Sequence, residues 1–221
     1  FSLYTFFMAV VNPGDEVIIP TPYWVSYGDQ VKMAEGVPVF VQAKEDNHFK
    51  VTVEQLEAAR TDKTKILVLN SPSNPTGMIY SREELLAIGN WAVAHDVLIL
   101  ADDIYGRLVY NGNEFVPISS LSEAIRKQTI LINGVSKAYA MTGWRVGYAV
   151  GNPAIIAAMS KLTGQTTSNL TAVSQYATIE ALTGPQDSVE TMRQAFEERL
   201  NTIYPLLCQV PGFEVVKPQG A

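Results

Sequence analysis

Short apolar runs alternate with longer segments of helical periodicity along almost the whole chain. Several of these runs are continuously apolar, which is typical of strands buried on both faces of a sheet. The predicted strands cover Glu16–Pro20, Val37–Val41, Lys65–Asn70, Val97–Ala101, Thr129–Asn133 and Val146–Val150. The predicted helices cover Ser2–Val11, Val25–Ala34, Val53–Ala59, Ser81–His95, Pro153–Thr163, Leu170–Leu182 and Val189–Leu207. This alternation predicts an α/β fold, an αβα sandwich whose mostly parallel sheet carries helices on both faces.

The composition and charge of the chain argue against some classes of binding partner. The 221 residues carry a net charge of −6, from 16 basic and 22 acidic side chains, and no basic run is visible. This balance argues against nucleic acid as a partner. No apolar run approaches the ~20 residues that a membrane-spanning helix needs. Cys208 is the only cysteine, so no internal disulfide forms, and we expect a reducing cytoplasm and a buried, structural Cys208.

Polar and aromatic side chains follow four of the predicted strands. They lie in Tyr23–Trp24, Asn70–Gly77, Asp102–Tyr105 and Asn133–Lys137. Ligands of open α/β sheets bind at the carboxyl ends of the strands, so we expect these segments to converge. Arg145 instead precedes its strand and joins the others only if Val146–Val150 runs antiparallel to its neighbours.

Lys137 and Arg145 together indicate a cofactor. A lysine amine forms a Schiff base with an aldehyde. An arginine holds a phosphate through two parallel hydrogen bonds. Aldehyde and phosphate occur together in pyridoxal 5'-phosphate (PLP). The alternatives are a solvated surface lysine and an arginine in a structural salt bridge.

Asp102 ends the apolar run Val97–Ala101. Burying a carboxylate at the end of an apolar strand costs free energy unless the carboxylate is paired. A protonated pyridine nitrogen would pair with it, and the negative charge would keep that nitrogen protonated, which makes the ring an electron sink. The alternatives are a helix N-cap or a structural ion pair, roles that Asp103 could also take.

Three further residues are candidates for contacting the cofactor ring. Tyr105 and Asn74 could both donate hydrogen bonds to its phenolate oxygen, and Trp24 could stack on the ring. Taken singly, Tyr105 could be a core aromatic, Asn74 a turn residue and Trp24 a packing residue. The two histidines stand apart from cysteine or carboxylate clusters, so no metal site is expected.

In order, these motifs resemble the class I/II aminotransferases, the fold-type I PLP enzymes, and within them bacterial aspartate aminotransferases. The resemblance is carried by Asn12–Val17, Pro22–Tyr27, Asn70–Gly77, Ala101–Tyr105 and above all Ser136–Tyr148. It implies that Lys137 is the Schiff-base lysine and Asp102 the partner of the pyridine nitrogen. It also implies that Tyr105 and Asn74 contact the phenolate oxygen, that Trp24 stacks on the ring and that Arg145 clamps the phosphate.

The resemblance also implies how the protein is organised. Residues 1–205 match the large PLP-binding domain, and residues 206–221 match the start of a small C-terminal domain. Such enzymes are homodimers with sites at the subunit interface. The family's glycine-rich phosphate loop would lie just before Phe1, and its arginine for the substrate α-carboxylate after Ala221. We therefore expect a longer protein and only weak PLP binding by these residues alone. Gly134 stands where many relatives carry a serine that contacts the phosphate.

Three functions fit such a chain. The leading one is transfer of an amino group between an amino acid, aspartate or similar, and a 2-oxo acid. The second is a PLP-dependent β-lyase, because the same cofactor frame supports more than one reaction. The third is a non-catalytic, effector-binding domain of a transcription regulator.

Overall fold

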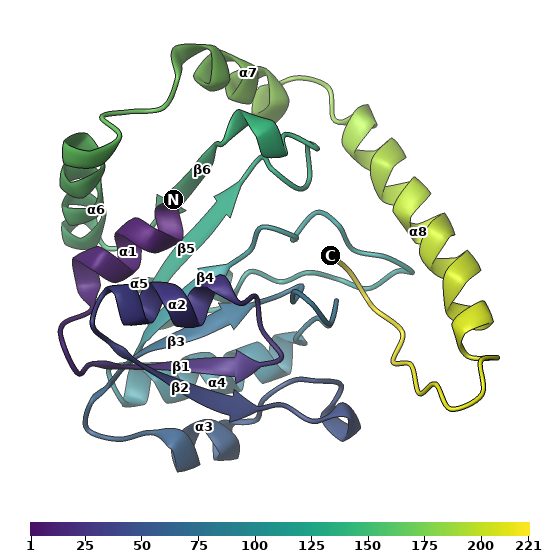
Figure 1. Ribbon diagram of the computed structural model, residues 1–221, viewed down its shortest axis with the longest axis horizontal. Coiled ribbons are helices and arrows are strands. Elements are labelled where there is room, and N and C mark those ends of the chain that lie inside the picture. The colour runs from purple at the N-terminus through teal and green to yellow at the C-terminus, as the bar shows by residue number, and fades with distance from the viewer.

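The computed structural model describes residues 1–221 and contains one six-stranded sheet of order β2-β1-β3-β4-β5-β6 (Figure 1). Its strands are β1 (Glu16–Thr21), β2 (Val37–Gln42), β3 (Thr64–Asn70), β4 (Leu98–Asp102), β5 (Thr129–Gly134) and β6 (Gly147–Val150). The first five strands are parallel, and β6 pairs antiparallel with β5. The predicted α/β class and mostly parallel sheet are confirmed.

Eight α-helices accompany the sheet. They are α1 (Ser2–Val10), α2 (Ser26–Met33), α3 (Val53–Ala59), α4 (Arg82–Ala94), α5 (Glu123–Gln128), α6 (Pro153–Thr166), α7 (Ala172–Thr183) and α8 (Asp187–Leu207). A capping box forms at the start of α4, where Ser81 and Glu84 each accept a hydrogen bond from the other's backbone N–H. Such pairing satisfies two amide groups that a helix start otherwise leaves without partners.

Two apolar cores cover the two faces of the sheet. One contains Leu56 of α3 and Leu85 and Ile88 of α4, packed against side chains from the central strands. The other contains Phe6 and Phe7 of α1, with contributions from α2 and α6. Because successive side chains of a strand point to opposite faces, each buried strand supplies both cores. This arrangement explains why the strands read as continuous apolar runs and confirms the αβα layering.

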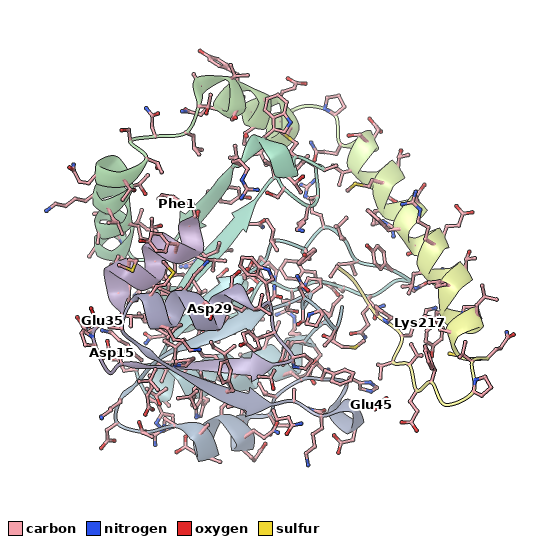
Figure 2. All side chains as sticks on the ribbon, in the orientation of Figure 1. Phe1, Asp15, Asp29, Glu35, Glu45 and Lys217 are labelled. Atoms are coloured by element: carbon pink, nitrogen blue, oxygen red, sulfur yellow. The ribbon has the colours of Figure 1, made fainter.

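α7 and α8 stand apart from these layers. Figure 1 shows α8 separated from the sheet, with the chain after it turning back toward the strands. In that returning segment Gly220 bridges Val109, and Lys217, labelled in Figure 2, donates to the Asn201 side chain of α8 at 2.9 Å. No helix of the structure has both the length and the apolar character needed to cross a membrane.

Two sequence-based expectations differ from the structure. The helix α5 was not predicted, because its six residues are too few to show a helical period, although Ser122 caps it by accepting from the Ile125 N–H. Cys208 was expected to be buried but is exposed, because it follows α8 where that helix stands away from the sheet.

The carboxyl ends of the central strands lie level with one another. Asn70 is paired with Asp102, and Asp102 with Ile132, so the ends of β3, β4 and β5 form one edge. The antiparallel β6 begins at this same edge, because Gly147 is paired with Gly134. The condition for Arg145 to join the other candidates is therefore met: it lies two residues before Gly147.

Candidate active site

A cavity of 530 Å³ opens at this edge of the sheet. The six candidate residues all line it: Trp24, Asn74, Asp102, Tyr105, Lys137 and Arg145. They come from the segments that follow β1, β3, β4 and β5 and from the one that precedes β6. Phe1 and Ser2, at the start of α1, line the same cavity. A cavity of this size is in the range that holds a small organic cofactor.

Asp102 is the buried acid of the cavity. It is 5% exposed at the end of β4. Its Oδ2 accepts a hydrogen bond from the Tyr27 hydroxyl at 2.7 Å, and its Oδ1 accepts from the Ile104 N–H at 3.3 Å. Both donors are neutral, so neither cancels the charge of the carboxylate.

Burial raises the pKa of Asp102 above its ordinary value, although the Tyr27 hydrogen bond, the Ile104 amide and the Lys137 charge all act in the opposite direction. Burial also raises the pKa of Tyr27, and the Asp102 charge adds to this rise. Tyr27 therefore stays a hydrogen-bond donor. This contact was not predicted: the pattern of α2 indicates that Tyr27 is buried but not which group its hydroxyl reaches.

Asn74 and Tyr105 meet at one side of the cavity. The Asn74 side-chain amide lies 3.5 Å from the Tyr105 hydroxyl, so two donors reach the same small region. Asn70 fixes the loop that carries Asn74: its Oδ1 accepts from the Asn74 N–H at 2.8 Å, and its Nδ2 donates to the Asp102 carbonyl at 2.8 Å. The Lys137 ammonium lies 5.3 Å from the centre of the Tyr105 ring, within cation–π range.

Arg145 and Trp24 are less enclosed. Arg145 is exposed, has φ 58°, and donates to the Thr142 carbonyl at 2.9 Å. The other donors of its guanidinium make no hydrogen bond within the chain, and the residue lines the cavity. Trp24 is 37% exposed and packs edge-on against Tyr27, with ring centres 5.4 Å apart. Its ring is thereby held next to the phenol that contacts Asp102.

Asp103 is a second buried acid, and it does not line the cavity. It is 5% exposed, and its Oδ2 has no hydrogen-bond partner. Burial and the neighbouring Asp102 charge raise its pKa to about 7. Neither alternative role considered for these acids, helix cap or structural ion pair, is observed for Asp103.

Comparison with known protein families gives a match over almost the whole chain. The model of the family "Aminotransferase class I and II" matches residues 2–221. The chain belongs to this family. The predicted resemblance is thereby confirmed over essentially the whole chain.

Similar proteins of this family carry related names. The chain is 75% identical over 221 residues to an asparagine–oxo-acid transaminase of Streptococcus mutans, and 60% identical over 219 residues to an aspartate aminotransferase of a Bacillus species. These matches include 100% and 99% of the chain but only 56% of each relative. The chain thus spans little more than half the length of the relatives it matches.

Solved structures agree on the fold. The chain superposes on an aspartate aminotransferase from Rhizobium meliloti with a TM-score of 0.97 at 43% identity, covering 99% of this chain and 55% of that one. It superposes on an aromatic aminotransferase from Pyrococcus horikoshii with a TM-score of 0.96 at 35% identity, covering 100% and 59%. These aminotransferases thus share the sheet and its carboxyl edge with this chain.

Proposed function

We propose that the protein containing this chain is a PLP-dependent aminotransferase. It would move an amino group between an amino acid, aspartate or a close analogue, and a 2-oxo acid. The observation that carries the proposal is one cavity lined by a lysine amine, a buried carboxylate without a cationic partner, and an arginine. Family membership and the names of similar proteins support the same reaction.

The donor set fits PLP. Asp102 has a buried carboxylate whose hydrogen bonds come only from neutral groups, so a protonated ring nitrogen would supply the missing positive charge. Asn74 and Tyr105 bring two donors to one point, as a phenolate oxygen requires. Arg145 would hold the phosphate at the mouth of the cavity. Trp24 would cover one face of the ring.

The protein residues have separate tasks in the proposed reaction. When bound, PLP supplies an aldehyde that captures amines and a ring that accepts the electron pair released at the substrate Cα. Lys137 would supply the amine that holds the aldehyde. When free, that amine would take the proton from the substrate Cα as a general base and deliver it, as an acid, to the cofactor carbon C4′ that had carried the aldehyde oxygen. Tyr27 and the Ile104 amide favour the charged form of Asp102 and orient its carboxylate. The Tyr105 ring holds the Lys137 ammonium through a cation–π contact.

Organisation and location are part of the proposal. Residues 1–205 would form the PLP-binding domain and residues 206–221 the start of a smaller one, a division that falls in the last turn of α8. A homodimer is supported by the exposed apolar side chains of α7, where Val173, Tyr176 and Ile179 are 66%, 76% and 57% exposed. The single cysteine supports a reducing cytoplasm.

The test is an assay of the complete protein with PLP, aspartate and 2-oxoglutarate. Transamination predicts oxaloacetate and glutamate in equal amounts, and no product without the acceptor. A parallel assay with cysteine-like substrates and no acceptor distinguishes the β-lyase, which would release pyruvate and ammonia. Binding of PLP without turnover of any amino acid would contradict the proposal and favour the effector-binding domain.

A further inference from the structure

Gln186 lies between α7 and α8, outside the cavity, and connects three separate segments. Its Oε1 accepts from the Arg107 guanidinium at 2.5 Å and from the Tyr139 hydroxyl at 3.1 Å. Its Nε2 donates to the carbonyls of Ala181 and Gly184 at 3.0 and 2.8 Å. Both ends of the amide are thus used, so the side chain is fixed in one orientation.

The partners of Gln186 lie next to the two residues that face each other in the cavity. Arg107 is two residues after Tyr105, and Tyr139 is two residues after Lys137. The Arg107 guanidinium also lies 5.7 Å from the centre of the Tyr139 ring. The segment after β4 and the segment after β5 are therefore joined through one shared acceptor, by residues that do not line the cavity.

Local backbone bonds transmit this constraint to the cavity. The Leu108 N–H donates to the Tyr105 carbonyl at 2.8 Å, and the Ala140 N–H donates to the Lys137 carbonyl at 3.1 Å. Each of these hydrogen bonds closes a turn, with Arg107 inside the first and Tyr139 inside the second. Holding Arg107 and Tyr139 on one oxygen fixes the turn of Tyr105 against the turn of Lys137.

We propose that Gln186 is a positioning residue, which sets the placement of Lys137 relative to Tyr105 by joining Tyr139 and Arg107. This inference rests on the function proposed above, because it concerns the delivery of the Lys137 amine to PLP. It assigns a role at the site to a side chain at the start of α8, a helix that otherwise stands away from the sheet.

The first measurement needs no cofactor. Hydrogen exchange of the Leu108 and Ala140 amides is compared between the complete parent protein, Gln186→Ala and Gln194→Ala. Gln194 is a matched control, since it lies on α8 and bonds only to Glu190 of the same helix. Loss of the shared acceptor should speed exchange of both amides by about tenfold in Gln186→Ala alone. Unchanged exchange of the Ala140 amide would overturn the proposal.

The second measurement is the PLP dissociation constant of the complete protein, followed by its absorbance. Gln186→Ala should raise this constant by about tenfold. Tyr139→Phe should weaken binding, and combining it with Gln186→Ala should add little. Effects of the two substitutions that add in the double variant would overturn the proposal. If the parent itself fails to bind PLP, the proposed function fails, while the exchange result still decides the positioning role.

Discussion

At the scale of single residues, the site depends on the contacts that hold the buried carboxyl group of Asp102. Removing the Tyr27 hydroxyl takes away the 2.7 Å hydrogen bond that favours the carboxylate. Tyr27→Phe should therefore raise the pKa of Asp102 further and destabilise the fold by about 1–3 kcal/mol. It should also weaken PLP binding, since the acid becomes a poorer partner for a cationic nitrogen.

Urea unfolding and PLP titration of the complete protein check this prediction. Tyr4→Phe is the matched control, because Tyr4 of α1 is half-buried and its hydroxyl makes no hydrogen bond within the chain. A Tyr27→Phe variant that matches the parent in both stability and affinity would show that the hydroxyl does not support Asp102.

Asp103 predicts a pH dependence of stability. Its pKa is about 7 in the folded protein and ~3.8 as an unperturbed group, so the unfolded chain loses the proton first as pH rises. The contribution of Asp103 to stability is therefore complete below pH ~4 and is lost between pH ~4 and ~7. Asp103→Asn, which cannot ionise, should be more stable than the parent at pH 8, by about 4 kcal/mol, and nearly equal at pH 4.

Chemical denaturation at the two pH values measures this difference. The comparison at pH 4 serves as the internal control, because the parent then carries a neutral acid of almost the same shape. A variant that is less stable than the parent at pH 8 would mean that the charged Asp103 is paired rather than isolated.

At the scale of elements, the pairing of β5 with β6 brings Arg145 to the cavity and leaves no room at Gly134. A Cβ there would lie 2.7 Å from the Val146 carbonyl oxygen and 3.1 Å from the Gly147 Cα. The glycine at this position is thus required by the close approach of the two strands. Replacing it with serine should destabilise the protein by about 1–3 kcal/mol, unless the strands move apart.

Gly134→Ser and Gly164→Ser should be compared by thermal or urea unfolding. Gly164 is a suitable control because nothing lies within 4 Å of a Cβ built on it in α6. We expect a lower midpoint for Gly134→Ser and an equal or slightly higher one for Gly164→Ser, since serine favours helix more than glycine does. Equal stability of Gly134→Ser and the parent would show that the strand pair adapts.

At the scale of the whole molecule, the sequence predicts the sheet well because its strands are buried on both faces. Continuous apolar runs located all six strands to within about one residue of their observed ends. The site could be predicted for a related reason, since parallel strands present their carboxyl ends at one edge. Arg145 lies at this edge only because β6 is antiparallel to β5. The sequence shows that this orientation is required, but it does not show whether β6 adopts it.

Other features depend on contacts between distant segments and leave little trace in sequence patterns. The Tyr27–Asp102 bond joins residues 75 positions apart, and Gln186 lies 47 positions from Tyr139. Tyrosine, aspartate and glutamine side chains occur in many environments, so the residue types alone do not predict these contacts. The exposure of Cys208 likewise follows from where α8 lies, which its own apolar residues did not indicate.

The central claim is that the Lys137 amine meets an aldehyde whose ring nitrogen is held by Asp102. The most direct measurement is the absorbance of the complete protein mixed with PLP, where an imine between lysine and cofactor absorbs at about 400 nm. The account predicts that Lys137→Ala abolishes this band and that Lys161→Ala, which changes an exposed lysine of α6, preserves it. A band that survives in Lys137→Ala would contradict the account.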